Sequence, residues 1–216
     1  MPLDAQVRRL VQSALRRGPR GAGDGVRLAA DARRLWRRVR GFVRDGLVRS
    51  PPDLCGLELA CWALQLPMRR GEDLIVGRLG MGNLRDRAEL AAQRLVEEVG
   101  EDVDPDLLDR TTRLLHETPA RPPVLEEAKL LADAVNLDDF GAGGALRQLA
   151  ELAARGEGVE TLAAAWRKGS EYGYWRARLA DGFHFPAARR LARRRLDNAR
   201  RVFEMLEEER REDEGE

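Results

Sequence analysis

The stretch that decides the fold reads EEAKLLADAVNLDDFGAGGA and covers residues 126–145. It places the carboxylate of Asp133 inside an apolar pattern that repeats at helical spacing. The residues that surround it in this pattern are Leu130, Leu131, Ala134 and Leu137. A carboxylate on the buried face of a helix is costly unless another group compensates its charge. We therefore expect Asp133 to be buried and to interact with a partner or a metal supplied by another part of the chain.

Composition predicts an all-α protein with a substantial core. Of the 216 residues 43% are hydrophobic but only 5% are aromatic, so the core must consist mainly of Leu, Ala and Val. These residues, together with abundant Glu and Arg, favour helices. The apolar periodicity and the Gly and Pro breaks predict about eight or nine helices. The expected ranges are 4–17, 26–48, 54–66, 84–99, 105–116, 124–138, 144–155, 159–178 and 186–212.

Three segments are expected along the chain. Residues 1–25 are predicted to form an N-terminal helix and a mobile loop, residues 26–186 the main helical domain, and residues 187–216 a C-terminal helix with a frayed acidic end. Residues 54–66, LCGLELACWALQL, are apolar nearly all round and should form the central helix. Residues 68–83 contain four glycines and are expected to form a loop.

Charge is balanced overall, at +1, but it is distributed unevenly. The first 50 residues hold many arginines and only four acids, whereas residues 97–139 are acidic. In the last helix the arginines lie near the N-terminus and the glutamates near the C-terminus, so both groups oppose the helix dipole. A bound anion or the acidic middle of the chain would compensate this order, and a solvated helix with screened charges is the other interpretation.

One helix of the N-terminal part carries arginines at three- and four-residue spacing. The predicted stripe consists of Arg33, Arg37, Arg40 and Arg44, widened by Arg34 and Arg38. A helix face of this kind is one way to contact the phosphates of a nucleic acid. The nearly neutral net charge and the absence of a recognisable nucleic-acid module in the sequence argue against that function.

Targeting signals are not evident in the sequence. It contains neither a signal-peptide pattern nor an apolar run long enough to cross a bilayer. Cys55 and Cys61 are separated by six positions, which is typical neither of a zinc site nor of a disulfide within one helix. We therefore expect a cytoplasmic protein with no membrane partner.

From Leu54 onward the order of helices resembles the HD superfamily of metal-dependent phosphohydrolases, and most closely its small bacterial single-domain members. The resemblance is carried by RAELAAQRL (87–95), TRLLH (112–116), AKLLADAVNLDDFGA (128–142) and the last helix from Ala187 to Glu209. It implies an HD-domain-like helical bundle. It also implies one or two divalent metals, held by His and Asp side chains, that activate water to attack a phosphate ester.

The ligand pattern of that family is incomplete in this sequence. Its His-Asp pair aligns with Leu64 and Gln65, and its earlier ligand His aligns near Asp31. Leucine cannot bind a metal, and a glutamine amide is a poor substitute for a carboxylate. The resemblance therefore leaves three candidate metal ligands, with Gln65 as a weak fourth, and assigns no catalytic residue. The three candidates are Asp133, His116 and Asp31, and the metal would be Mn, Fe, Mg or Ni.

Three functional hypotheses follow. The first is an HD-like domain that has lost hydrolase activity, needs no cofactor, and binds a nucleotide or another anion, or a protein partner. Its candidate anion-binding residues are Arg34, Arg37 and Arg38. Without a metal, Asp133 is expected either to hydrogen-bond a helix terminus or to pair with an arginine such as Arg34 or Arg38. The alternative is a divergent phosphohydrolase that uses the three candidate metal ligands. The second alternative is a nucleic-acid-binding helical protein that uses the arginine stripe.

Other chemically suggestive groups have structural interpretations. Adjacent residues of a helix point about 100° apart, so Asp138 and Asp139 should not converge on one atom. His184 is expected to pack in a turn. The glycines of residues 141–144 should permit close helix packing, because the segment lacks the features of a phosphate loop. An aromatic group either packs the core or lines a pocket or partner surface, and its members are Trp166, Tyr172, Tyr174 and Trp175.

Overall fold

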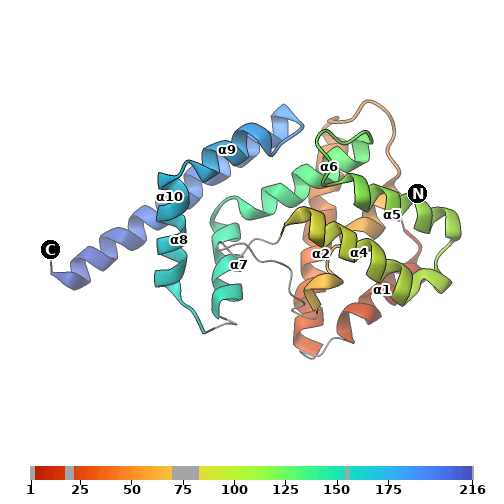
Figure 1. Ribbon diagram of the computed structural model, residues 1–216, viewed down its shortest axis with the longest axis horizontal. Coiled ribbons are helices and arrows are strands. Elements are labelled where there is room, and N and C mark those ends of the chain that lie inside the picture. The colour runs from red at the N-terminus through yellow and green to blue at the C-terminus, as the bar shows by residue number, and fades with distance from the viewer. Residues whose placement is uncertain (1–2, 18–21, 70–82, 154–155, 216) are drawn as a thin grey trace. The chain divides into compact units, whose positions relative to one another are not determined.

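The computed structural model describes residues 3–17, 22–69, 83–153 and 156–215, and within these residues the chain is all-helical, as predicted (Figure 1). The α-helices in the described ranges are α1 (Ala5–Arg16), α2 (Ala22–Arg44), α3 (Leu54–Ala63), α4 (Leu84–Val99), α5 (Pro105–Glu117), α6 (Glu126–Asn136), α7 (Ala142–Ala153), α8 (Val159–Glu171), α9 (Tyr174–Asp181) and α10 (Pro186–Glu214). Three short 3-10 helices accompany them, η1 (Pro67–Arg69), η2 (Gly100–Asp102) and η3 (Leu137–Asp139).

Two differences from the expected helix ranges have clear physical causes. The helix expected over residues 159–178 is divided into α8 and α9, because Gly173 adopts a φ of +68°, outside the helical region. The helix expected to begin at Val26 begins at Ala22 instead. Of the loops expected over residues 18–25 and 68–83, residues 18–21 and 70–82 lie outside the described part of the chain.

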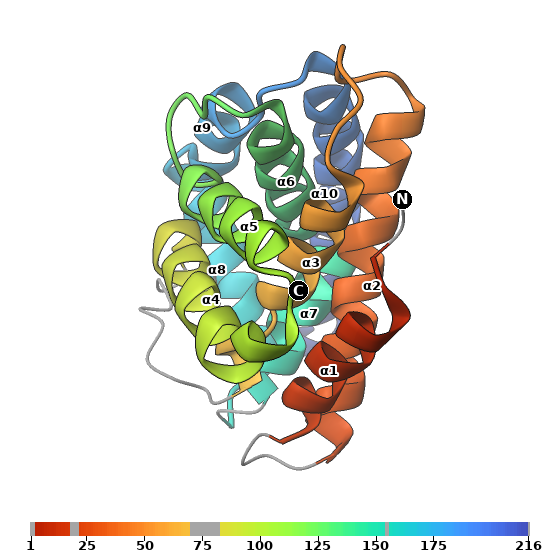
Figure 2. The same cartoon turned by 90° about the vertical axis from the view of Figure 1, so that its right-hand side faces the viewer.

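The described residues up to Ala134 form one compact unit, in which α3 is central. Its residues from Gly56 to Ala63 are buried, and it packs against α2 and α5, while α4 and α5 lie side by side (Figure 2). Asp53 caps α3 as expected, since its Oδ1 atom accepts hydrogen bonds from the backbone N–H groups of Cys55 and Gly56, both at 3.1 Å. This cap fixes where the central helix begins.

A buried charge connects α1 to α3 in the same unit. Glu58 lies on α3 and is only 2% exposed. Its Oε1 atom accepts a hydrogen bond from Arg8 Nε at 2.8 Å, and its Oε2 atom accepts one from the Leu3 backbone N–H at 3.4 Å. The first helix is therefore attached to the central one by a partly desolvated ion pair.

The described residues from Val135 onward form a second unit. Its core contains a run of aromatic rings: Trp166 stacks on Phe203 with centroids 4.4 Å apart, and Trp175 follows Trp166 at 5.0 Å. Phe140 then meets Trp175 edge-on at 5.5 Å. Gly144 permits a close approach of α7 to η3, because a Cβ atom there would lie 2.5 Å from the Asp139 carbonyl oxygen. Close packing at this glycine agrees with the sequence-based expectation.

Among the described helices, none combines the length and the apolar content needed to cross a bilayer.

Candidate functional site

Asp133 is fully buried, as its place in the apolar pattern predicted. It lies on α6, and its neighbours Leu130, Leu131 and Ala134 are buried as well. A hydrogen bond joins this part of α6 to α2, since Arg38 Nη1 donates to the Ala134 carbonyl oxygen at 2.7 Å. The half-buried guanidinium of Arg38 is thus used within the protein, next to the candidate carboxylate.

Asp31 and Arg34 lie on the same face of α2 as Arg38, because the three are separated by three and four positions. Arg34 Nη1 and Asp31 Oδ1 form an ion pair, and Arg27 Nη1 lies 3.9 Å from Asp31 Oδ2. The Asp31 carboxylate therefore faces two arginines. A cation that used Asp31 as a ligand would have to compete with both of them.

The positions that align with the His-Asp pair are part of the core. Leu64 is fully buried and Gln65 is 4% exposed. The Leu64 carbonyl oxygen accepts a hydrogen bond from Arg87 Nε of α4 at 2.9 Å. An apolar side chain, an amide and a guanidinium thus occupy the place where the resemblance would require imidazole and carboxylate groups.

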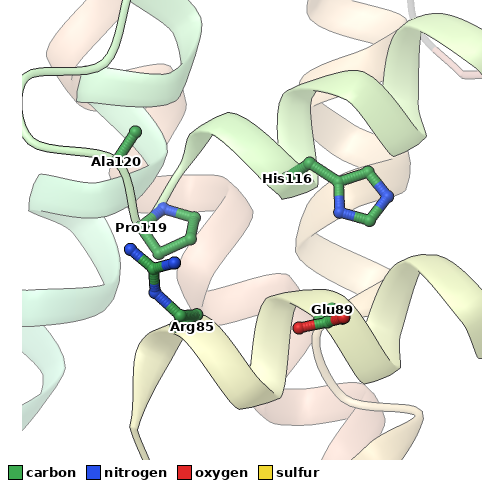
Figure 3. A pocket seen from close by; sticks show the side chains of 5 residues that line it. All are labelled: Arg85, Glu89, His116, Pro119 and Ala120. Atoms are coloured by element: carbon green, nitrogen blue, oxygen red, sulfur yellow. The ribbon is translucent and has the colours of Figure 1, made fainter.

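His116 lies near the end of α5 with an exposed side chain, where it lines a pocket of about 240 Å³ (Figure 3). Arg85 and Glu89 of α4 and the backbone turn at Pro119 and Ala120 complete the lining. In the part of the chain that the structure describes, no three His, Cys, Asp or Glu side chains converge closely enough to hold a metal ion. The set of metal ligands stays a prediction from the resemblance.

The six arginines of α2 from Arg33 to Arg44 separate into two groups. Arg34 and Arg38 are half-buried and make the contacts given above, whereas the stripe formed by Arg33, Arg37, Arg40 and Arg44 is exposed. The three residues predicted to bind an anion, Arg34, Arg37 and Arg38, are therefore not on one surface. Only Arg37 among them belongs to the exposed stripe, since neighbouring positions on a helix point about 100° apart.

Few intrachain contacts occupy the exposed stripe. The Arg33 guanidinium lies 5.8 Å from the centroid of the Trp62 ring, and Arg44 Nε lies 3.4 Å from an Asp45 carboxylate oxygen at the solvent-exposed end of the helix. The side chains of Arg37 and Arg40 form neither an ion pair nor a hydrogen bond with another residue of the described ranges. From Arg33 to Arg44 the stripe extends about 16 Å, at 1.5 Å per residue.

Sequence reasoning missed a polar network in the second unit. Arg178 of α9 donates from Nη1 to Asp139 Oδ2 at 2.8 Å and to the Tyr174 hydroxyl oxygen at 3.0 Å. Its Nη2 atom donates to Asn136 Oδ1 at 2.8 Å, and Asn136 Nδ2 donates to the Gly182 carbonyl oxygen at 2.6 Å. Arg178 thus holds α9 against the end of α6 and η3.

The network changes the acidity of its own members. Burial raises the pKa of the Tyr174 hydroxyl above its usual value of 10.0, although the positive charge of Arg178 opposes this change. For Arg178 burial acts to lower the pKa, but Asp139 and Tyr174 outweigh it, so the pKa is raised. Because the donors and acceptors satisfy one another, the network serves packing.

The remaining candidates have structural roles. Asp138 pairs with Arg147 at 3.8 Å while Asp139 pairs with Arg178, so the adjacent carboxylates diverge as expected. His184 is half-buried in the turn before α10. Of the aromatic group, Trp166, Tyr174 and Trp175 pack against other rings, whereas Tyr172 is 78% exposed.

Comparison with known proteins adds no relative, because no protein-family model, curated protein or solved structure matches this chain.

Proposed function

We propose that this chain is a non-catalytic binding module that holds a phosphate-bearing polyanion on the exposed arginine stripe of α2. The observation that carries the proposal is the exposure of Arg37 and Arg40 between Arg33 and Arg44, with no acidic partner for either among the described residues. Guanidinium groups pair with phosphate through two parallel hydrogen bonds and keep their charge at every physiological pH. A row of such groups on one helix face is the electrostatic footprint of a nucleic-acid backbone.

The shape of the stripe favours a polyanion over a single nucleotide. A mononucleotide needs several charged groups that converge on one point, and the half-buried pair that would supply them, Arg34 and Arg38, is engaged by Asp31 and by the Ala134 carbonyl. A linear stripe of about 16 Å instead matches a series of phosphates along a strand. We therefore place the ligand on the exposed face of α2 and commit to a nucleic-acid backbone as its chemistry.

An HD-like fold that has lost hydrolase activity is part of the same proposal. It is supported by the burial of Leu64 and Gln65, neither of which supplies an imidazole or a carboxylate. It is also supported by the arginines that face Asp31. On this proposal Asp133 is a buried structural carboxylate.

Fluorescence anisotropy with labelled single-stranded and duplex oligonucleotides tests the proposal. The double variant Arg37→Ala/Arg40→Ala should bind at least about tenfold more weakly at low salt, and the magnitude of its slope of log K against log salt should fall by about 1.5 to 2. The matched control is Arg121→Ala/Arg176→Ala, which removes the same charge from exposed positions off the stripe. An equal loss in both variants, or no binding by the unmodified protein, would contradict the proposal.

A further inference from the structure

The last helix, α10, carries a second ordered charge pattern that the α2 stripe does not explain. Six charged residues follow one another along one face, at alternating steps of four and three positions. All six side chains are exposed: Arg190, Arg194, Asp197, Arg201, Glu204 and Glu208. We call this set the α10 stripe. Its mean spacing of 3.6 residues equals the repeat of a straight α-helix, so the six side chains lie on one face that can meet a neighbouring helix.

The charges on the α10 stripe are arranged so that the stripe is complementary to a copy of itself that runs in the opposite direction. Read from the N-terminus it is plus, plus, minus, plus, minus, minus, and read backwards every sign is inverted. Two copies of the helix that lie antiparallel therefore oppose unlike charges at all six positions. Arg190 would face Glu208 of the second copy, Arg194 would face Glu204, and Asp197 would face Arg201, each pair occurring twice by the two-fold symmetry.

We propose that two copies of this chain associate through an antiparallel pairing of their α10 helices, along the α10 stripe. A second copy is the occupant of this face for which the charge order itself argues, because one repeated contact then opposes unlike charges at all six positions. Within one copy the two outer pairs cannot form, since Arg194 and Glu204 are ten positions apart, or about 15 Å along the helix, and Arg190 and Glu208 are farther apart still. Only the central pair, Asp197 and Arg201, is close enough to meet within its own helix. Asp197 of the stripe also forms a local ion pair with Arg200, which lies beside the stripe, at 3.5 Å.

The helix dipole provides an independent reason for this partner. Arginines near the N-terminus of α10 and glutamates near its C-terminus both oppose the dipole. An antiparallel second helix places its acidic end beside the basic end of the first, and its dipole runs in the opposite direction. The charge order that is unfavourable in one copy is therefore compensated in two. α10 is long enough for this contact, because the stripe extends about 27 Å and the helix continues to the C-terminal end of the described chain (Figure 1).

The association should be weak and sensitive to salt. Exposed ion pairs each contribute little, and the stripe offers charge complementarity rather than a large apolar area. Met205, which is 59% exposed beside Glu204, is the large apolar side chain nearest the stripe. Screening shortens the range of the pairs from about 10 Å at 0.1 M salt to about 3 Å at 1 M. We expect a dimer that forms with rising protein concentration at low salt and dissociates at high salt.

Charge reversal of one facing pair tests the proposal, with sedimentation velocity on the full chain as the measurement. Arg194→Glu places like charges opposite each other twice in the dimer, and so does Glu204→Arg. Each variant alone should dimerise about tenfold more weakly at low salt. An equimolar mixture of the two variants should regain association, because the R194E chain presents acidic groups at both positions and the E204R chain presents basic groups at both. The double variant R194E/E204R should also dimerise.

The control is Arg176→Glu, which makes the same change in net charge as Arg194→Glu at an exposed position of α9 and should leave dimerisation unchanged. Circular dichroism checks that each variant remains helical. Three results would overturn the proposal: a monomer at every concentration at low salt, dimerisation that survives both single reversals, or a mixture that associates no better than its components. Since the arginine stripe of α2 is intact in all these variants, oligonucleotide binding should be retained in each of them.

Discussion

Removal of the Arg8 guanidinium should destabilise the first unit more than removal of any exposed arginine beside it. The Glu58 side chain is 3% exposed and the Arg8 side chain 34% exposed, with 2.8 Å between Nε and Oε1. Breaking a fully buried ion pair by deleting one partner costs about 3–5 kcal/mol, because the other charge stays desolvated. Water reaches about a third of Arg8, so we expect Arg8→Ala to cost about 2–3 kcal/mol. For a chain of this size that lowers Tm by about 5–10 °C.

Thermal and urea unfolding, followed by circular dichroism, measure this effect. Arg9→Ala is the matched control: Arg9 is exposed, its Nε donates only to the Ala5 carbonyl within the same helix, and its loss should cost less than about 0.5 kcal/mol. A second variant combines Arg8→Ala with Glu58→Leu. Because R8A/E58L contains no uncompensated buried charge, it should recover most of the stability that R8A loses. Equal stability of R8A and R9A, or no recovery in the double variant, would refute the reasoning.

Three further predictions follow from single features. Gly41 lies within α2 with open space around the position of a Cβ atom, so Gly41→Ala should stabilise the protein by about 0.5–1 kcal/mol. Gly144→Ala should instead destabilise it by at least about 2 kcal/mol, because the added Cβ atom would overlap the Asp139 carbonyl oxygen. Urea unfolding measures both effects, and a change of the free energy of unfolding in the same direction for both variants would contradict this account. If Asp133 is a structural carboxylate, addition of excess Mn²⁺ or of EDTA should leave Tm unchanged in a thermal-shift assay, and a rise in Tm with Mn²⁺ that Asp133→Ala abolishes would favour the phosphohydrolase alternative. Since the pKa of Tyr174 is raised in the folded state, the neutral hydroxyl contributes stability that is fully present below the unfolded pKa of about 10 and is lost as pH rises through the folded pKa. Tyr174→Phe should therefore have a lower free energy of unfolding than the unmodified protein at pH 7, because it loses the hydrogen bond from Arg178. The difference in the free energy of unfolding between the two proteins should narrow above about pH 10. A difference that stays constant with pH would show that the titration of Tyr174 is not linked to folding.

The features that local sequence determines were predictable. The burial of Asp133 followed from the four apolar residues around it, and the start of α3 followed from Asp53 after two prolines. The break between α8 and α9 was missed, because the apolar pattern continues across Gly173 and only the positive φ angle interrupts the helix. A single glycine within a periodic segment is compatible with either outcome.

The candidate site was less predictable, because spacing on a helix does not reveal which face other elements cover. Arg34 and Arg37 look equivalent in the sequence, yet one is half-buried beside Asp31 and the other is exposed. The pairing of Arg178 with Asp139 had no local signal, since 39 positions separate the two residues. It depends on how α9 packs on η3, which is decided by tertiary contacts.

The run of aromatic rings in the second unit also has an optical consequence. Trp166 and Trp175 have ring centroids 5.0 Å apart, which is close enough for their electronic transitions to couple, and Trp166 is in addition stacked on Phe203. The second unit should therefore give a near-ultraviolet circular dichroism signal that depends on this packing. Trp36 and Trp62 belong to the first unit, and Trp62 is buried in α3. Each unit thus contains its own pair of indoles, so replacing one pair by phenylalanine allows the unfolding of either unit to be followed by itself.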